Sequence, residues 1–495
     1  MFRTQRELAM LRRTRILVTA ATFLTFAGLP ARAQVQFNEV TVAAGLLPVT
    51  RDDWQGGGMY RGGAAIADFD RDGWLDLFVH GAAQRPDRLF LNQRNGTFVD
   101  HAADWGVNRQ HSGGSIAAGD FNSDGWIDLY VMSLGELGNH EPGKHMLYRN
   151  EAGQGFVDIA LGAGVQTTSP VFPDGSGCTF GDYDLDGDLD LFTSAWSYPI
   201  PNQGNLLFRN NGDETFTNVT ASAGLIMTYT HGMAPALIDM NGDRYPELLL
   251  AGDFGSSRYF ENDRDGTFTD RTTQAHVAQE FSGMGQTVAD LDRDGDLDWY
   301  VTAIYSHHVG NDGNKLYLNL GNDRYREVSK ETGTDDGAWG WGVIATDLDN
   351  DGWLDLVENN GFSGDYANDP TRLWLGNSRL QYADSALAAG LDYNLNGLGV
   401  FHFDYDGDGD QDLVLTGGRL GLLRLYRNDS VAGNWLRVTL DSSARPDLAP
   451  DGIGSLVRVE AGGQSWIQTV DAECNFLGTS EIVAHFGLGA KSLVD

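Results

Sequence analysis

The chain has 495 residues, of which 69 are Asp or Glu and 34 are Lys or Arg, so its formal net charge at pH 7 is −35. A chain this acidic lacks the positive surface that binds phosphates, which argues against a nucleic-acid partner. Two cysteines are too few for a disulfide-stabilised scaffold. The length fits one large repeat domain with a small appendage better than three ordinary domains.

The first 33 residues have the pattern of a secretory signal peptide. Arginines at positions 12, 13 and 15 precede an apolar run from Ile16 to Leu29, and Ala31-Arg32-Ala33 offers a small-x-small cleavage site. The run is shorter than the roughly 20 residues that span a bilayer. We predict that residues 1–33 are removed on export, with an uncleaved anchor as the alternative. The mature protein is then periplasmic or secreted and has no membrane span.

An acidic loop at residues 68–77 sets the pattern of the rest of the chain. Asp68, Asp70, Asp72 and Asp76 occupy positions 1, 3, 5 and 9 of this loop, and Gly73 occupies position 6. Carboxylates this close raise one another's pKa unless a cation lies among them. Ca²⁺ takes six to eight oxygens at flexible geometry, whereas Mg²⁺ demands a stricter octahedron. The loop therefore predicts a calcium site that also uses the backbone carbonyl of position 7.

This loop is not an EF-hand. An EF-hand needs a bidentate Glu at position 12 and a helix on each side. Position 12 is Val79 here, and residues 74–79 have the pattern of a strand.

The loop occurs seven times, at steps of 51 to 62 residues, a period typical of propellers and solenoids. The fourth copy departs from the pattern, because Arg244 stands at position 6 and Gly242 two residues earlier, yet we expect a metal ion there too. We predict about seven Ca²⁺ ions. The predicted ligands at positions 1, 3, 5, 7 and 9 are Asp68, Asp70, Asp72, Trp74, Asp76; Asp120, Asn122, Asp124, Trp126, Asp128; Asp182, Asp184, Asp186, Asp188, Asp190; Asp239, Asn241, Asp243, Tyr245, Glu247; Asp290, Asp292, Asp294, Asp296, Asp298; Asp347, Asp349, Asp351, Trp353, Asp355; and Asp404, Asp406, Asp408, Asp410, Asp412.

Each repeat contains four predicted strands, the number that makes a propeller blade. In the second repeat these are residues 114–118, 126–131, 146–150 and 155–159. Small residues let the innermost strands converge on an axis. Glycines stand five places before the opening Asp at Gly63, Gly177, Gly285, Gly342 and Gly399. The predicted fold is all-β, with a seven-bladed β-propeller over residues 34–430 and a calcium loop in every blade.

The two ends of the repeat region complement each other. The seventh repeat lacks a fourth strand, and residues 36–45 match the fourth-strand pattern of residues 214–224. We predict that the N-terminal segment completes the last blade and closes the ring, which leaves few free strand edges.

The seven loops and the segments of the form Phe-x-Asp-Val-Thr-x-x-Ala-Gly resemble FG-GAP/VCBS repeats, the integrin-type calcium propeller. The tail, from Asn434-Trp435-Leu436 through Asp451-Gly452-Ile453 to His485-Phe486-Gly487, resembles an ASPIC/UnbV domain. The pairing resembles proteins of the cartilage acidic protein-like family. The resemblance implies an exported, calcium-binding, non-enzymatic adhesion or interaction protein.

The tail also reads as β structure by itself, because residues 435–440 and 456–459 alternate as half-buried strands do. ASPIC/UnbV domains usually run on for another strand or more beyond the point where this tail ends, at Asp495. We therefore expect a small, shortened β domain at residues 431–495 that docks against the propeller.

Aromatic residues gather in loops that a propeller would place on the face opposite the calcium loops. Loops on a rigid scaffold commonly carry function, and flat rings suit a sugar or a protein partner. The alternative is that these rings pack over the mouth of the channel. The candidate ligand-binding residues are Trp54, Tyr60, Trp196, Tyr198, Tyr305, His307, His308, Phe362 and Tyr366.

No catalytic motif stands out. The segment His140-Glu141-Pro142-Gly143-Lys144-His145 approximates the zinc motif His-Glu-x-x-His, but its second His is one residue late and Pro-Gly excludes the helix that would align the ligands. We predict a non-enzymatic adhesion or interaction module for extracellular protein or polysaccharide. The alternative is a calcium-dependent propeller lyase or hydrolase acting on polysaccharide, with a base such as His307 or His308.

Cys178 and Cys474 lie in different predicted domains. A bond between them would join the domains, and two buried free thiols are the alternative.

Overall fold

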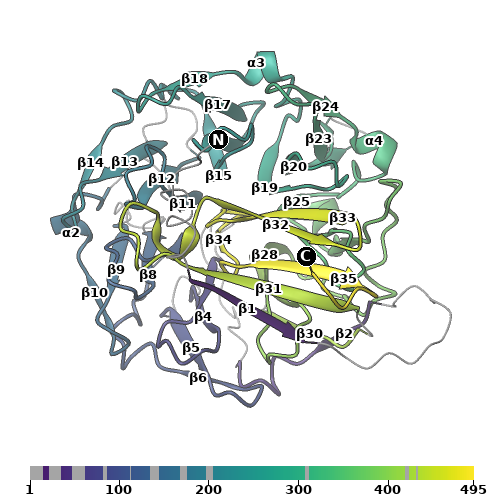
Figure 1. Ribbon diagram of the computed structural model, residues 1–495, viewed down its shortest axis with the longest axis horizontal. Coiled ribbons are helices and arrows are strands. Elements are labelled where there is room, and N and C mark those ends of the chain that lie inside the picture. Colours follow the sequence, from purple (N-terminus) through teal and green to yellow (C-terminus); the bar gives the residue numbers. More distant parts are fainter. Residues whose placement is uncertain are drawn as a thin grey trace, which may run out of the picture.

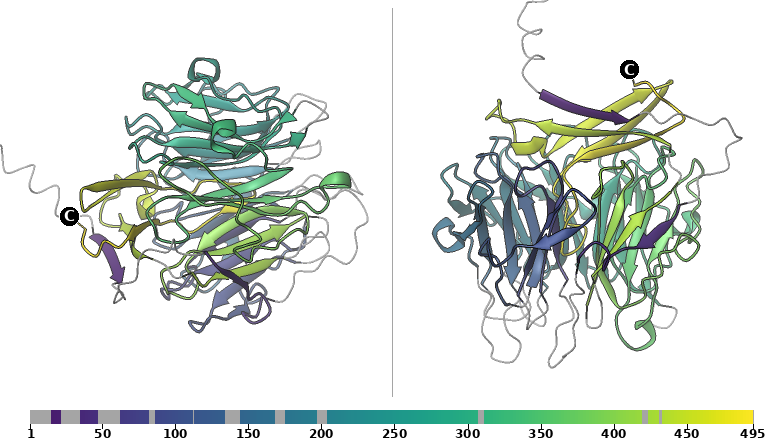
Figure 2. Two further views of the ribbon diagram at one scale, coloured as in Figure 1. Left: turned by 90° about the vertical axis from the view of Figure 1, so that its right-hand side faces the viewer. Right: turned by 90° about the horizontal axis from the view of Figure 1, so that it is seen from below.

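The computed structural model describes residues 15–21, 35–46, 62–81, 86–111, 113–133, 144–167, 175–196, 204–306, 311–418, 423–430 and 433–494. Seven β-sheets form a ring around a central axis (Figure 1). A smaller β domain lies on one face of the ring (Figure 2). The predicted fold class, a seven-bladed propeller with a C-terminal β domain, is confirmed.

The blades follow one another along the chain. Their strands are β3 (Ala64–Ala67), β4 (Asp76–Val79), β5 (Arg88–Asn92), β6 (Phe98–Asp100); β7 (Gly113–Gly119), β8 (Asp128–Ser133), β9 (Met146–Asn150), β10 (Phe156–Asp158); β11 (Gly177–Gly181), β12 (Asp190–Ser194), β13 (Leu206–Asn210), β14 (Phe216–Asn218); β15 (His231–Ile238), β16 (Glu247–Asp253), β17 (Arg258–Asn262), β18 (Phe268–Asp270); β19 (Gly283–Ala289), β20 (Asp298–Ala303), β23 (Lys315–Asn319), β24 (Tyr325–Glu327); β25 (Gly340–Thr346), β26 (Asp355–Asn360), β27 (Arg372–Trp374); and β28 (Gly397–Phe403), β29 (Asp412–Gly417), β30 (Arg424–Asn428). Short elements between them are α2 (Ala160–Ala163), α3 (Thr272–Ala275), β21 (Tyr305–Ser306), β22 (Asn311–Asp312), α4 (Ser329–Thr332) and η1 (Gly364–Tyr366).

The ring closes as the sequence predicts. Strand β2 (Phe37–Glu39) pairs antiparallel with β30, with Phe37 opposite Asn428. The last blade therefore has the strand order β2-β30-β29-β28 and takes its outermost strand from the N-terminal part of the chain.

Blade 6 corrects the prediction of four strands in every repeat. Within residues 311–418, all of which are described, this blade has three strands, and the fourth is reduced to one bridge between Trp374 and Asp384. The side chain of Asn377 donates to the carbonyl of Gln381 at 2.6 Å. This bond folds the connection into a turn, so little of it is left to form a strand.

An asparagine at the end of the third strand joins neighbouring blades. The side-chain amide of Asn92 donates to the carbonyl of Leu75 in its own blade at 3.2 Å and to the carbonyl of Tyr405 in blade 7 at 2.8 Å. Blade 6 has Gly376 at this position and lacks the bond. The other inter-blade bonds run from Asn150 to Phe69, Asn210 to Phe121, Asn262 to Tyr183, Asn319 to Met240 and Asn428 to Leu348.

The innermost strands pack too closely for side chains at certain positions. A Cβ atom on Gly285 would lie 2.2 Å from the carbonyl oxygen of Trp341 in the next blade and 2.5 Å from that of Asn475. Such contacts exclude every residue but glycine. They explain why Gly285, one of the five glycines that stand five residues before an opening Asp, is a glycine.

The C-terminal domain comprises β31 (Asn434–Asp441), η2 (Pro450–Gly452), β32 (Ser455–Ala461), β33 (Gln464–Val470), β34 (Gly478–Thr479) and β35 (Ala484–Gly489). Its residues 471–481, which we name the plug, enter the propeller channel, where β34 pairs in parallel with β3. The backbone N–H of Gln286 donates to the carbonyl of Asn475 at 3.2 Å, and that of Ile116 donates to Leu477 at 3.3 Å. The domain therefore docks, as expected, and also fills the channel.

Both cysteines are buried free thiols. Cys178 lies on β11 and Cys474 lies in the plug, and both contact the hydroxyl of Ser115. The Cys178 N–H donates to this oxygen at 3.3 Å, and the Cys474 Sγ lies 3.4 Å from it. Of the two alternatives that the sequence leaves open, the structure has the free thiols.

Residues Arg15–Ala21 form β1, which pairs antiparallel with β31 from Arg15 opposite Asp441 to Ala21 opposite Trp435. This segment belongs to the predicted signal peptide, whose cleavage remains a prediction. With it in place, the sheet of the C-terminal domain has the order β1-β31-β35. Among the described residues, no helix has the length and apolar character needed to cross a membrane.

Candidate metal centres and ligand face

All seven acidic loops adopt the same turn, with positive φ at positions 4 and 6. In the first loop, Gly73 has φ 91°, and its N–H donates to Oδ2 of Asp68 at 2.8 Å. In the fourth loop, Arg244 takes φ 83° and donates to Oδ2 of Asp239 at 2.8 Å. The arginine therefore leaves the turn geometry unchanged, although L side chains rarely adopt this conformation.

The carboxylate at position 9 fastens each loop to its blade. Asp76 is 1% exposed, and its two oxygens accept the N–H of Phe69 at 3.0 Å and the N–H of Asn92 at 2.8 Å. Burial raises the pKa of Asp76 to about 8, and the charges of Asp70 and Asp68 contribute to the rise. The same pair of bonds forms at Asp128, Asp190, Asp298, Asp355 and Asp412.

The loop carboxylates converge. In four loops, three carboxylates each offer an oxygen that lies within 4.8 Å of the other two, and in two of these loops the position-9 residue, Asp76 or Asp190, is one of the three. Burial, with neighbouring carboxylates adding to it, raises the pKa of Asp182 and Asp290 to about 7. Buried carboxylate oxygens without a hydrogen-bond partner among the described residues occur on Asp184, Asp290 and Asp406. This set of crowded, unpaired oxygens fits Ca²⁺.

Two loops carry an asparagine at position 3. The amide nitrogen of Asn241 donates to Oε1 of Glu247 at 3.0 Å, and that of Asn122 donates to Oδ2 of Asp124 at 3.1 Å. A bound cation would need these amides to present oxygen instead. The second and fourth loops therefore fit calcium less directly than the all-carboxylate loops do.

The C-terminal domain covers part of the face that carries the acidic loops. Trp466 donates its Nε1–H to the carbonyl of Gly352 at 3.0 Å, and His485 lies 2.8 Å from the side-chain oxygen of Asn350. Arg293 of the fifth loop is 4.6 Å from the ring centres of both Trp353 and Trp466. The fifth and sixth acidic loops therefore contact the C-terminal domain directly, so a change in their conformation would shift the docked domain.

The described members of the predicted ligand face are Trp196, Tyr305, Phe362 and Tyr366, and all four are partly exposed. The hydroxyl of Tyr366 lies 3.5 Å from the carbonyl oxygen of Tyr305, and the Trp196 Nε1–H donates to Asp253 at 2.9 Å. The other predicted members, Trp54, Tyr60, Tyr198, His307 and His308, lie outside the described residues.

The structure adds Trp339, which the sequence reading missed. Phe362 stacks on it with ring centres 4.1 Å apart. Beneath this pair, Trp341 stacks on Phe476 of the plug at 5.1 Å. Trp339 and Phe362 therefore present partly exposed faces, while Trp341 and Phe476 are buried. The sequence signal was the pair Trp339 and Trp341 at the start of β25.

Two family models match the chain. The FG-GAP-like repeat matches residues 68–131, 239–301 and 304–358, and ASPIC and UnbV matches residues 446–495. The chain therefore carries FG-GAP-like repeats and a C-terminal ASPIC and UnbV domain, as the resemblance in the sequence predicts.

Among curated proteins, the chain is similar to cartilage acidic protein 1 of three vertebrates. The Xenopus tropicalis protein is 27% identical over 331 residues, covering 61% of this chain and 48% of its own length. The Homo sapiens protein is 26% identical over 325 residues, covering 61% and 47%. The chain thus spans about half the length of the curated relatives it matches.

Solved structures also align with the chain. One describes specific recognition of non-reducing terminal N-acetylglucosamine by an Agrocybe aegerita lectin, with a TM-score of 0.40, 15% identity, and coverage of 83% of this chain and 94% of that chain. Another is BBS1N in complex with ARL6DN, with a TM-score of 0.42, 12% identity, and coverage of 76% and 96%.

Proposed function

We propose that this chain, with its FG-GAP-like repeats and its ASPIC and UnbV domain, is an exported calcium-binding propeller that serves as an extracellular interaction module. The observation that carries the proposal is the convergence of buried, unpaired carboxylate oxygens in the acidic loops, such as those of Asp184 and Asp290. An exported protein meets an environment in which millimolar-affinity calcium sites of this kind are filled.

Calcium has a structural role in this proposal. Each loop joins the first two strands of its blade, and in six of the seven loops the position-9 carboxylate also accepts a backbone N–H from the third strand or the residues directly after it. A Ca²⁺ ion that neutralises the crowded carboxylates of a loop therefore stabilises the whole blade. The sixth loop also contacts the C-terminal domain through Gly352 and Trp466, so calcium there stabilises the docked domain.

The partner binds the opposite face, on the aromatic cluster around Trp339 and Phe362. Trp and Phe faces that are rigidly stacked and partly exposed suit a polysaccharide or a protein surface. Phe254 and Phe281 are 43% and 52% exposed and contact each other edge to face. Phe254 also contacts Trp196, which packs against the same hydrophobic cluster as Trp339 and Phe362, so these rings extend the apolar surface.

The test is an incubation of the calcium-loaded protein with a panel of extracellular polysaccharides, in which bound protein and released sugar ends are scored together. Binding that Phe362→Ala weakens at least about tenfold, while Leu161→Ala on the outer rim does not, supports a glycan-binding module. Release of product would replace the proposal with a polysaccharide lyase or hydrolase. If the protein binds no polysaccharide, the same two variants are tested for binding to extracellular protein partners.

A further inference from the structure

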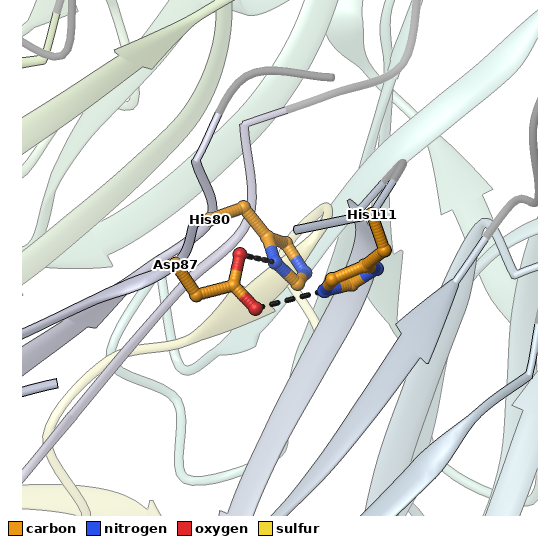
Figure 3. A group of neighbouring side chains, drawn as sticks. All are labelled: His80, Asp87 and His111. Atoms are coloured by element: carbon orange, nitrogen blue, oxygen red, sulfur yellow. Dashed lines mark hydrogen bonds and ion pairs between the residues drawn. The ribbon is translucent and has the colours of Figure 1, made fainter. Parts of the chain in front are cut away.

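Two histidines and an aspartate meet where blade 1 contacts blade 2 (Figure 3). His80 directly follows β4, Asp87 directly precedes β5, and His111 lies just before β7. Nδ1 of His80 is 3.1 Å from Oδ1 of Asp87, and Nε2 of His111 is 2.8 Å from Oδ2. One ligand atom from each residue lies within 4.8 Å of the other two.

The protein is built closely around this cluster. The side chains of His80 and Asp87 are 0% and 1% exposed, and that of His111 is 8% exposed. A Cβ atom on Gly113 would lie 2.3 Å from Cγ of His80, and one on Gly63 would lie 2.8 Å from its Cδ2. These two glycines therefore provide the space that the imidazole of His80 occupies.

The polar atoms of the cluster are incompletely satisfied. Nε2 of His80 and Nδ1 of His111 are buried, and neither makes a hydrogen bond of normal geometry to a described residue. Within the described part of the chain, the ion-pair partners of Asp87 are these two histidines. Oδ1 of Asp87 also accepts the backbone N–H of Gly81 at 3.0 Å. The unsatisfied polar atoms of the cluster are therefore the two ring nitrogens that face away from Asp87.

We infer that His80, Asp87 and His111 bind one divalent transition-metal ion of the zinc type, at a site separate from the calcium loops. Imidazole nitrogens favour zinc-type metals over calcium. Catalytic zinc sites typically have three protein ligands and one open coordination position, and this cluster offers three ligands. Neighbouring ligand atoms around a tetrahedral ion with bonds of about 2.0–2.1 Å lie about 3.3 Å apart. Nδ1 of His80 lies close to this separation from Oδ1 of Asp87, at 3.1 Å. Nε2 of His111 contacts the other carboxylate oxygen, Oδ2, so the side chains need a small shift for one oxygen of Asp87 to bind the ion together with both histidines.

His145 is the second histidine of the segment that approximates the zinc motif His-Glu-x-x-His. Its Nδ1 atom is not available as a ligand of this site. That nitrogen accepts the N–H of Ser133 at 3.0 Å. The ligands instead come from three separate loops with no common motif, so a search for sequence motifs does not find them.

The test is a titration of the calcium-saturated full chain, stripped of transition metals, with Co²⁺ followed by competition with Zn²⁺. The visible absorption of Co²⁺ reports nitrogen ligation, and calorimetry gives the stoichiometry. We expect one tightly bound ion per chain, and His111→Ala and Asp87→Asn should each weaken its affinity by at least about 100-fold. His101→Ala, which removes a partly exposed histidine outside the cluster, is the matched control and should leave binding of the ion unchanged.

The substitutions His111→Ala and Asp87→Asn suit this test because both variants should still fold. The small exposed fraction of His111 and the similar size of Asn and Asp favour folded proteins, which thermal unfolding in calcium verifies. The inference is overturned if the wild-type chain binds no Co²⁺ or Zn²⁺. It is equally overturned if folded His111→Ala and Asp87→Asn bind the ion as tightly as the His101→Ala control.

Discussion

Asn92 in the first blade donates its side-chain amide to the backbone carbonyl of Tyr405 in the seventh, at 2.8 Å. The bond connects the third strand of one blade to the metal loop of another. Equivalent bonds join all neighbouring blades except blades 5 and 6, because Gly376 stands where blade 6 would need an asparagine. A Cβ atom on Gly376 would lie 2.1 Å from the carbonyl of Leu354, so this position cannot carry the asparagine.

Replacing Asn92 should weaken the closure of the ring. Asn92→Ala leaves the carbonyls of Leu75 and Tyr405 without this donor in a buried place, so the free energy of unfolding should fall by about 1–3 kcal/mol. Urea unfolding in calcium measures the change. Gln154→Ala, which removes an exposed amide, should change stability by less than about 0.5 kcal/mol. Equal effects of the two variants would show that the inter-blade bond does not contribute.

Position 6 of the loops allows a reciprocal pair of substitutions. Arg244 has φ 83°, which costs a side chain about 1–2 kcal/mol, so Arg244→Gly should raise the free energy of unfolding by about 1 kcal/mol. Gly73 has φ 91° and open space around its Cβ position, so Gly73→Ala should lower it by a similar amount through backbone strain alone. Chemical denaturation of both variants in calcium checks the signs. Changes of the same sign would contradict the account.

These loops also show how far sequence reasoning reached. The strict spacing of oxygens predicted every loop, and the pattern of residues 36–45 predicted that the N-terminal segment completes the last blade, where Phe37 is found opposite Asn428. The plug was not predicted, because its contacts, such as Gln286 N–H to Asn475 and Trp341 on Phe476, join single residues of different blades to one short segment and form no periodic pattern in the sequence. The cluster of His80, Asp87 and His111 was missed because it combines unrelated loops.

One loop ligand should contribute modestly to stability. Asp184→Ala removes a buried oxygen donor from the third loop only, so the other loops stay filled. A site at tenfold calcium excess adds about 1.4 kcal/mol by mass action, which sets the scale of the loss. Calorimetric titration should show one fewer calcium ion per chain, and thermal unfolding should show a small decrease. Asp213→Ala, on an exposed turn of the same blade, serves as the control.

The buried side chain of Glu358 should make the free energy of unfolding depend on pH. Glu358 accepts the side-chain amide of Asn314 at 2.7 Å, and burial raises its pKa to about 8 from an ordinary 4.5. The folded state therefore keeps a proton that the unfolded state loses. The contribution of Glu358 to stability is complete below about pH 4.5 and is lost as the pH rises toward 8, a total on the order of 4 kcal/mol.

Glu358→Gln removes this titration, so its stability relative to the wild type should increase between pH 5.5 and pH 8. Urea unfolding of both proteins in calcium isolates the effect, because other titrating groups cancel in the difference. A difference that is independent of pH would show that Glu358 is ionised in the folded protein.

Chelation of calcium tests the central claim most directly. Seven sites at tenfold calcium excess supply on the order of 10 kcal/mol together, and without the ions the crowded carboxylates repel one another. Thermal unfolding after treatment with a calcium chelator should show a large fall in the melting temperature that added Ca²⁺ restores. An unchanged melting temperature would contradict calcium as the structural ion of this propeller.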